Sequence, residues 1–469
     1  MTVLEEYKTN VVQEQSNALH IVMYPWFALG HLTSFLHLAN KLAQKGHKIS
    51  FILPNKTRLK LDPLNHYPDL ITFIPITVPV VEGLPMGAET TADVSFQDRS
   101  YVMAAMDLTK DAIDLLISQI KPDFVFFDFT EWLPGVASKH GVKSLYYATL
   151  FTVSGSYFLP RARLASVGGR DLTQPPPGFP ASKSMIKLHA HEARAVGHAI
   201  TQMEFGGPGK SILQRHAIAL EACDAFATKG CTEMDNIYCN FIRQVYGKPV
   251  LLAGPVVPEP PSGKLDQELA DWLSGFGKGS VVYCALGSEC FLSKDNFQEL
   301  LLGLELTGMP FVAALKAPLE CETIESSLPK GFIERTKGRG LVAGGWVQQQ
   351  LIMQHPSVGC FVTHCGAGSI TEALVSHCSL VLLPQVTDQF INARMLSLDL
   401  QVGIEVEKDD NGNFSKDRVC DAIKVIMDEE SLVGKTTRIN HEKWRELLLV
   451  KGLEDAYIDD FVQDLRALI

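Results

Sequence analysis

The sequence lacks any long hydrophobic run, since no apolar stretch approaches the roughly 18 residues that a membrane span requires. The first residues, MTVLEEYKTNVVQEQSN, are polar and acidic. They contain neither the apolar core of a secretory signal nor the arginine-rich character of a transit peptide. We therefore expect a soluble, cytoplasmic protein with no membrane span.

Positive charge is also scarce. Lysine and arginine number 42 against 53 aspartates and glutamates, which gives a net charge of −11 and argues against nucleic-acid or anionic-membrane partners. The 10 cysteines are scattered rather than clustered, as expected of free thiols in a reducing compartment. The chain of 469 residues exceeds one ordinary core, so it suggests two or three domains.

Several common enzyme signatures are absent. The loop PWFALGHLTS after the first apolar run has one glycine and is not G-x-G-x-x-G, which argues against a dinucleotide dehydrogenase. The P-loop-like triplets at 209–211 and 434–436 carry Glu204 and Glu429 where the first P-loop glycine belongs. No G-x-S-x-G elbow occurs. The histidine–cysteine pairs match no common zinc spacing, and we expect no metal site.

What the sequence does contain is two series of alternating strand and helix patterns. The first opens with LHIVMY, the helical HLTSFLHLANKLAQKG and the strand KISFILP, which together form a βαβ unit. The second begins after residue 260 with KGSVVYCALGS. The sequence therefore predicts an α/β protein with two doubly wound domains. We expect an N-terminal domain over 1–253, a Pro/Gly-rich linker over 254–263, a C-terminal domain over 264–450, and a terminal helix over 451–469 that packs back on the first domain.

Three chemistry-bearing residues stand at expected strand ends, where open α/β sheets bind ligands. His31 follows the first strand and its loop, Asp128 closes FVFFD, and His364 closes VGCFVTH. A histidine held by a carboxylate is a good general base, because the carboxylate fixes the tautomer and stabilises the imidazolium. On spacing alone, however, a lone histidine at a helix start is more often a helix cap or a surface group, and Asp128 is explained as a simple strand end.

The turn THCGAGSITEAL, around Gly366 and Gly368, has the features of a phosphate site. Its glycines allow close backbone approach, and Ser369 is placed to cap the helix that follows. Free N–H groups and the positive end of the helix dipole would then face a diphosphate. Many αβ turns use such a pattern, so the turn alone does not specify a ligand.

The longer segment from Trp346 to Gln389 strongly resembles the donor-binding box of plant family 1 UDP-sugar glycosyltransferases. It carries the opening Trp, the Q-x-x-L and H-P-x-x-G-x-F-x-T-H-C-G phrases, the S-x-x-E step and the closing Asp-Gln. GH at 30–31, FDFTEWLP at 127–134, LAGPVVPEP at 252–260 and LGS at 286–288 extend the likeness over essentially the whole chain. WVQQQL and ALGSECFLSKDNFQELLLGLELTGMPF look most like the branch that adds a sugar to an existing sugar.

The resemblance implies a GT-B fold: two facing Rossmann-like domains, with the acceptor cleft in the first and the UDP-sugar site in the second. It implies that His31 is the catalytic base and Asp128 its carboxylate partner, in an inverting reaction that needs neither a metal nor a cofactor beyond the UDP-sugar co-substrate. Trp346 would then stack on uracil, and the backbone of Val347 would bind the base.

The same resemblance assigns the remaining donor contacts. Gln349 and Glu372 match positions that hold the ribose. Asp388 and Gln389 match positions that bind the hydroxyls of the donor sugar. The diphosphate contacts fall on the side chains and turn backbone of Ser288, His364, Gly366, Gly368 and Ser369.

One departure from the family pattern concerns the donor. The usual Trp-Asn is Ala367-Gly368 here, so the asparagine contact to phosphate is lost. Gln389 favours UDP-glucose, yet the branch also includes xylosyl-, arabinosyl- and rhamnosyltransferases, and the donor stays open.

The acceptor side is less defined. Four aromatic residues either line an acceptor pocket or belong to the core or rim: Trp26, Phe27, Phe129 and Trp132. The leading interpretation is a monomeric enzyme that glycosylates a plant small-molecule glycoside, such as a flavonoid or anthocyanin 3-O-glycoside. The alternatives are direct action on a flavonoid, terpenoid or xenobiotic aglycone, and a non-catalytic UDP-sugar-binding protein, against which the intact His31 and Asp128 argue.

Overall fold

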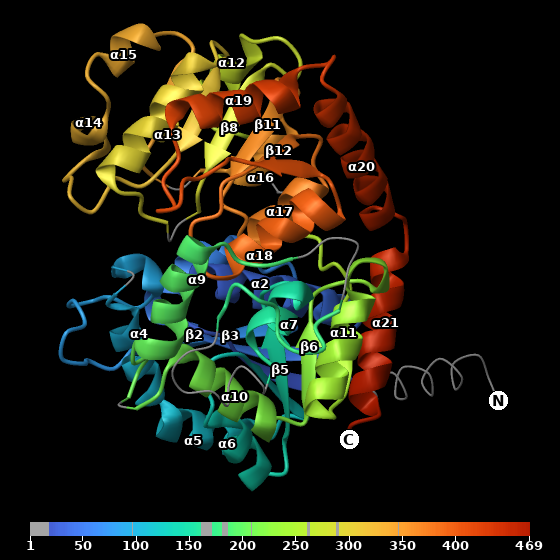
Figure 1. The fold of residues 1–469 in the computed structure, drawn as a ribbon. Helices are drawn as coiled ribbons and strands as arrows, with labels where there is room; N and C mark the ends of the chain where they lie inside the picture. Colours follow the sequence, from blue (N-terminus) through green and yellow to red (C-terminus); the bar gives the residue numbers. More distant parts are fainter. Residues whose placement is uncertain are drawn as a thin grey trace.

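Two parallel β-sheets, each covered by helices on both faces, form the structure, a computed structural model that describes residues 18–95, 97–160, 171–180, 186–207, 209–259, 263–287, 290–345 and 347–469 (Figure 1). The first sheet has seven strands: β1 (His20–Tyr24), β2 (Lys48–Pro54), β3 (Ile71–Ile76), β4 (Phe124–Phe127), β5 (Lys143–Ala148), β6 (Ala225–Thr228) and β7 (Val250–Leu252). The second has six: β8 (Val281–Ala285), β9 (Phe311–Ala314), β10 (Gly340–Ala343), β11 (Val358–Thr363), β12 (Ser379–Leu382) and β13 (Gly403–Glu405).

The strand order repeats between the sheets and confirms the predicted α/β class. The orders are β3-β2-β1-β4-β5-β6-β7 and β10-β9-β8-β11-β12-β13, with every pair parallel. Strands such as FVFF of β4 are buried along their whole length, because helices cover both faces of the sheet. The order in which successive strands are added to the sheet reverses between β1 and β4, and again between β8 and β11. Each of these switch points opens a crevice at the carboxyl ends of the strands.

Helices of the N-terminal half follow the apolar periodicity of the sequence. Its longest, α2, buries Leu32, Phe35 and Leu42 on one face and stops before Gly46, which has a positive φ of 86°. The helices are α2 (Leu29–Gln44), α3 (Arg58–Leu61), α4 (Arg99–Asp107), α5 (Lys110–Ile120), α6 (Leu133–Lys139), α7 (Thr152–Phe158), α9 (Ala190–Gly197), α10 (Ile212–Ala222) and α11 (Thr232–Tyr246), with short turns η1 (Asn55–Thr57), η2 (Asp62–Leu64), η3 (Thr91–Asp93) and the π-helix η4 (His198–Gln202). The helical turns α9 and η4 therefore interrupt a stretch that is rich in glycine and proline.

The second half has the same build. Its helices are α12 (Gln267–Ser274), α13 (Lys294–Leu306), α14 (Ile324–Ser327), α15 (Phe332–Arg335), α16 (Gln349–Gln354), α17 (Ala367–Leu374), α18 (Asp388–Arg394), η5 (Met395–Asp399), α19 (Lys416–Met427) and α20 (Leu432–Leu448). In the described ranges, no helix is long and apolar enough to cross a membrane.

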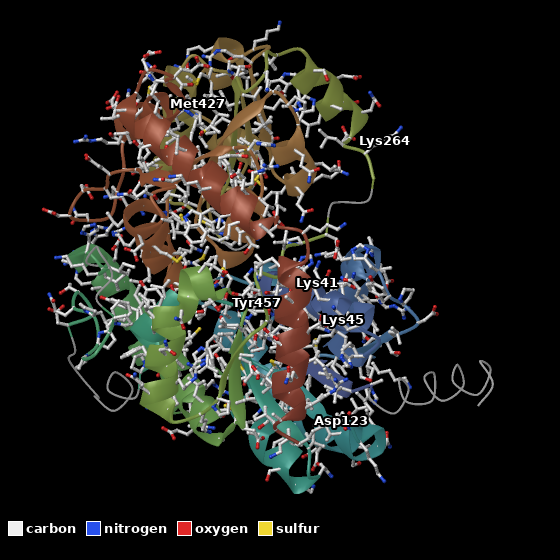
Figure 2. The ribbon with its side chains drawn as sticks, turned by 90° about the vertical axis from the view of Figure 1, so that its right-hand side faces the viewer. Lys41, Lys45, Asp123, Lys264, Met427 and Tyr457 are labelled. Atoms are coloured by element: carbon white, nitrogen blue, oxygen red, sulfur yellow. The ribbon has the colours of Figure 1, made fainter. Side chains whose placement is uncertain are left out.

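The last helix, α21 (Leu453–Arg466), returns to the N-terminal half (Figure 2). Its buried Phe461 meets the ring of Phe126 of β4 edge-on at 6.2 Å. Lys41 of α2 binds Glu454 at 2.8 Å and also Glu259, which follows β7. One lysine therefore joins α2, the segment that leaves the first sheet and the start of α21. Residues 260–262 of the expected linker lie outside the described residues.

Candidate active site

His31 and Asp128 meet at the switch point of the first sheet. His31 is the third residue of α2, which follows β1, and Asp128 directly follows β4, the neighbour of β1. The Nδ1 atom of His31 lies 2.7 Å from Oδ2 of Asp128. The fold therefore brings together two residues that stand 97 positions apart in the chain.

Asp128 is fixed by its own hydrogen bonds. Its Oδ1 accepts the backbone N–H groups of Trp26 and Phe129, each at 2.8 Å. The residue is 1% exposed, whereas the His31 side chain is 26% exposed. A carboxylate held this way keeps the imidazole hydrogen on Nδ1, which leaves Nε2 as the basic nitrogen. Thr149, which no motif in the sequence singles out, places its hydroxyl 3.0 Å from the same Nδ1.

Aromatic rings border the His31–Asp128 pair. The ring of Phe129 lies 5.5 Å from that of His31 and stacks on Trp26 at 5.3 Å. Phe205, from the segment before α10, packs against both Trp26 and Phe129. Phe27 is 0% exposed and packs on Tyr24, so it belongs to the core, the second of the two alternatives for that residue.

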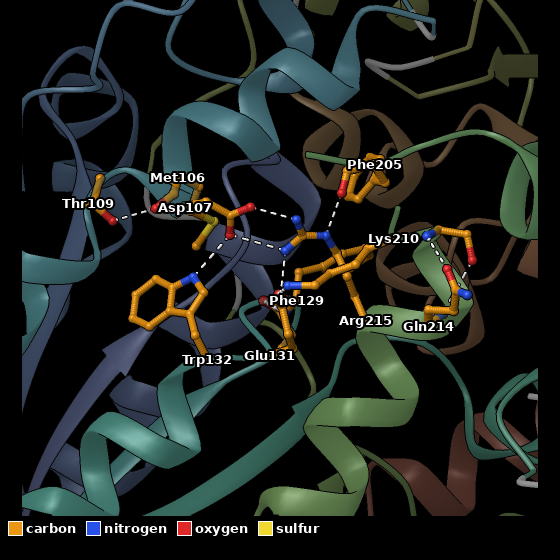
Figure 3. A network of polar contacts seen from close by, with 12 residues as sticks. Met106, Asp107, Thr109, Phe129, Glu131, Trp132, Phe205, Lys210, Gln214 and Arg215 are labelled. Carbon is orange, nitrogen blue, oxygen red and sulfur yellow. Dashed lines mark hydrogen bonds and ion pairs between the residues drawn. The ribbon is translucent and has the colours of Figure 1, made fainter. Parts of the chain in front are cut away.

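A buried ionic network supports this aromatic cluster (Figure 3). Arg215 of α10 is 0% exposed and binds Asp107 and Glu131, each at 2.5 Å. Its Nε donates to the carbonyl of Phe205. Asp107 also accepts the indole N–H of Trp132 at 3.0 Å. Phe205 is therefore bonded to the fully buried Arg215 directly, and Trp132 is bonded to it through Asp107.

In the second sheet, His364 occupies the equivalent switch point between β8 and β11. Its ring lies so close to two loops that a Cβ on Gly287 would fall 2.7 Å from Nε2, and one on Gly366 2.5 Å. Both glycines are therefore required by close approach. Gly366 is the N-cap of α17, so the cap residue itself has no side chain to bond that N-terminus. The expectation that Ser369 caps the helix is wrong, since Ser369 is its third residue.

Ser369 instead belongs to a cluster of side chains on α16 and α17. The amide nitrogen of Gln349 donates to Ser369 at 3.1 Å and to Glu372 at 2.7 Å. Burial raises the pKa of the Glu372 carboxyl, while hydrogen bonds from Gln349 and Gln350 and the positive charge of Lys229 act against that rise. Glu372 and Gln350 also border a cavity of about 460 Å³ that separates α16 and α17 from the end of α2 and the start of α21.

Asp388 lies at the start of α18, after Thr387, which has a positive φ of 44°. Its carboxyl accepts hydrogen bonds from Thr387 at 3.0 Å and from Asn392 at 3.1 Å. Burial raises its pKa, and the positive charge of His31 is among the influences that oppose this rise. Thr149 contacts His31, and Ser154 of the next helix, α7, donates to the backbone carbonyl of Asp388 at 3.3 Å, so the segment after β5 contacts both residues.

The other expected donor residues fall as follows. The side-chain oxygen of Gln389 accepts the N–H groups of Gln385 and Val386. The carbonyl of Val347 accepts the N–H of Gln349 at 2.9 Å. A Cβ on Gly368 would meet nothing within 4 Å. Ser288 and Trp346 lie outside the described residues. Within the part of the chain that the structure describes, no group of three or more His, Cys, Asp or Glu side chains is arranged to hold a metal ion.

Comparison with known proteins agrees with this architecture. Residues 248–443 match the family model of UDP-glucoronosyl and UDP-glucosyl transferases. A cyanidin 3-O-galactoside 2''-O-xylosyltransferase of Actinidia chinensis var. chinensis is 53% identical, covering 96% of this chain and 98% of the relative. An anthocyanidin 3-O-glucoside 2''-O-glucosyltransferase of Ipomoea nil is 50% identical, covering 97% and 99%.

The chain belongs to the UDP-glycosyltransferase family.

Solved structures identify the fold of this UDP-glycosyltransferase as GT-B. UGT73P12 of Glycyrrhiza uralensis, complexed with glycyrrhetinic acid 3-O-monoglucuronide, superposes with a TM-score of 0.79 at 19% identity, covering 96% of each chain. An anthocyanidin 3-O-glucosyltransferase in complex with UDP gives a TM-score of 0.74 at 23% identity, covering 96% of this chain and 99% of that one. The predicted family and GT-B fold are confirmed, and the similarity of the relatives places the chain in the sugar-on-sugar branch.

Proposed function

We propose that this UDP-glycosyltransferase adds a sugar to a hydroxyl on the sugar of a flavonoid or anthocyanin 3-O-glycoside. The names of three relatives support the acceptor class, since they are 2''- or 2'''-O-glycosyltransferases of anthocyanidin or cyanidin 3-O-glycosides at 45–53% identity. The donor is a UDP-hexose or a UDP-pentose, because these relatives include both glucosyl- and xylosyltransferases.

The observation that carries the mechanism is the 2.7 Å contact between His31 and Asp128 at the carboxyl edge of the first sheet, beside the segment in which Ser154 bonds Asp388 of the second domain. In the proposed reaction, Nε2 of His31 takes the proton of the acceptor hydroxyl as its oxygen attacks the anomeric carbon. The C–O bond to the diphosphate breaks on the opposite side, so the configuration inverts. His31 becomes an imidazolium that Asp128 stabilises.

Charge that develops on the departing UDP is stabilised by His364 and by the N-terminus of α17. The N–H groups there are not bonded by a side-chain cap, and the helix dipole favours an anion at that end. Ser369, Glu372 and Gln349 form the ribose and phosphate contacts in this scheme. No metal or further cofactor is needed, and EDTA is expected to leave the rate unchanged. We also propose that the enzyme acts as a cytoplasmic monomer.

A donor and acceptor panel tests this function. The purified protein is incubated with UDP-glucose, UDP-xylose, UDP-arabinose or UDP-rhamnose and with cyanidin 3-O-glucoside, a flavonol 3-O-glucoside or the matching free aglycones. Mass spectrometry is expected to detect one added sugar on the glycosides only, and NMR an inverted linkage to the existing sugar. Activity confined to the aglycones would reject the sugar-on-sugar proposal. UDP binding without transfer to any acceptor would favour the non-catalytic alternative.

A further inference from the structure

Lys229 lies at the end of a strand of the first domain, but its side chain hydrogen-bonds the second domain. It directly follows β6, at the same carboxyl edge as His31 and Asp128. Its Nζ donates to the hydroxyl of Thr371 at 2.9 Å and lies 3.5 Å from the carbonyl oxygen of Ala367. Both partners are on α17, so the lysine crosses the interface between the domains.

The ammonium group is buried at some energetic cost. Lys229 is 5% exposed, and burial lowers its pKa to about 8, against the opposing charge of Glu372. A buried ammonium is tolerated where polar partners replace water. Here the partners are Thr371 and Ala367, and the ring of Phe151 lies 6.0 Å away.

The bonding pattern on α17 is complementary. The hydroxyl of Thr371 donates to the carbonyl of Ala367 at 3.0 Å and accepts from Lys229. Ala367 is the first residue of the helix and Thr371 the fifth, so Lys229 hydrogen-bonds the N-terminal turn of α17. Ser369 lies between these two residues, and Glu372 follows directly.

We propose that Lys229 is a positioning residue for the UDP-sugar, which holds α17 of the opposite domain in the geometry that presents Ser369 and Glu372 to the donor. This inference rests on the proposed function of α17 in binding the ribose and the diphosphate. Its consequence is asymmetric: loss of the tether weakens the donor contacts, which lie on α17, and spares the acceptor contacts, which lie on the first domain.

The test compares the donor KM with the acceptor KM in three variants. Lys229→Met removes the charge and the hydrogen bonds, Lys229→Arg keeps a cation, and Thr371→Val removes the hydroxyl at similar volume. The donor panel identifies the UDP-sugar, and initial rates then give KM for each substrate and kcat. Isothermal titration calorimetry gives Kd for UDP.

We expect Lys229→Met to raise the donor KM and the Kd for UDP about tenfold or more, while the acceptor KM changes less than twofold. Thr371→Val should raise the donor KM and the Kd for UDP a few-fold. Lys229→Arg should give values of both constants close to those of the wild type. The matched control is Lys248→Met, which removes a partly exposed ammonium whose hydrogen bonds go to the Glu221 and Cys223 carbonyls of its own domain. Its donor constants should equal those of the wild type.

Unchanged donor KM and UDP Kd in both Lys229→Met and Thr371→Val would overturn the inference, even if the melting temperature or kcat fell. If Lys229→Met does not fold, the Thr371→Val constants decide alone. A wild-type protein that binds UDP but transfers no sugar would instead refute the proposed function, and the Kd values would still test the tether.

Discussion

Asp128 gives its two carboxylate oxygens to different partners. Oδ1 accepts two backbone N–H groups, and Oδ2 faces Nδ1 of His31. In Asp128→Asn, the amide must either abandon the backbone donors or present its NH₂ group to Nδ1. The second arrangement favours the tautomer with hydrogen on Nε2. That nitrogen then cannot take the proton from the hydroxyl of the acceptor substrate. We expect kcat to fall by about 10³–10⁴, with the Kd for UDP unchanged. A kcat within tenfold of the wild type, measured by UDP release, would contradict this role.

Arg215 provides a second residue-scale prediction. Replacing it by methionine leaves Asp107 without its cation and leaves Glu131, which is 7% exposed, with only its partly exposed partner Lys210 at 2.7 Å. Breaking a buried ion pair by removing one partner costs about 3–5 kcal/mol, and urea denaturation should show a loss of this size. The control is Lys143→Met, whose pair with Asp224 at 3.4 Å is partly exposed and should contribute less than about 1 kcal/mol. If both variants lost the same free energy of unfolding, the Arg215 network would stabilise the protein no more than an exposed ion pair does.

At this scale, sequence reasoning finds residues that follow strands within a known motif and misses those that do not. His31, Asp128 and His364 were predictable because each stands after an apolar run. Lys229 also follows a strand, AFAT, and that signal was available, but its partner Thr371 lies 142 residues further along the chain. No local pattern gives such a pairing. Arg215 reads as an ordinary polar residue of a helix.

Among the elements, the turn between α2 and β2 contains a titratable group. His47 is 2% exposed, and its Nδ1 accepts the N–H of Leu19 at 3.0 Å, the residue before β1. Burial, together with the positive charge of Arg466, lowers its pKa to about 4. The unfolded chain binds this proton near pH 6.5, so between about pH 6.5 and pH 4 the unfolded state binds more protons and stability is lost as the pH falls.

The measurement compares the wild type with His47→Gln, which keeps an acceptor but does not titrate. Relative to the variant, the free energy of unfolding of the wild type should fall by up to about 1.4 kcal/mol per pH unit below pH 6.5, and by about 3 kcal/mol at pH 4. Above pH 7 the difference should not depend on pH. A difference that is flat from pH 7 to pH 4 would mean that the folded protein protonates His47 as readily as the unfolded chain.

Helices are predictable from the sequence where the apolar periodicity extends over several turns, but the residues at which they begin and end are not. The pattern of α2 gives that helix almost whole, since its apolar residues recur along one face. The start of α17 is missed because Gly366 takes the cap position through its extended backbone, with no side-chain cap to mark it. The helices α9 and η4 are not predicted, because glycines and prolines surround them in the sequence.

For the whole molecule, α21 ties the end of the chain to the first domain. Phe461 is 0% exposed and lies in the core with Ile458 and Leu465. Phe461→Ala should lower the free energy of unfolding by about 3–5 kcal/mol, measured by chemical denaturation. The control Leu432→Ala, at a side chain that is 78% exposed on α20, should change it by less than about 0.5 kcal/mol. Similar losses would show that α21 adds little to the stability of the first domain.

The two doubly wound sheets follow from the alternation of strands and helices, but the fit between the domains does not. That fit depends on buried polar contacts such as Lys229 with Thr371, Ser154 with Asn392 at 2.8 Å, and Arg394 with Glu192 at 2.8 Å. Each joins residues more than 140 positions apart. Charge and hydropathy patterns along the chain do not encode which polar residue meets which, so only the folded structure identifies these tethers.

In the proposed reaction, His31 of one domain activates the acceptor hydroxyl against a UDP-sugar that the other domain holds. The most direct measurement is kcat for His31→Ala with the UDP-sugar that the donor panel identifies and an anthocyanidin 3-O-glucoside, alongside the Kd for UDP. We expect kcat to fall by a factor on the order of 10³ or more, with the Kd for UDP within about threefold of the wild type. A kcat within tenfold of the wild type would contradict this proposal.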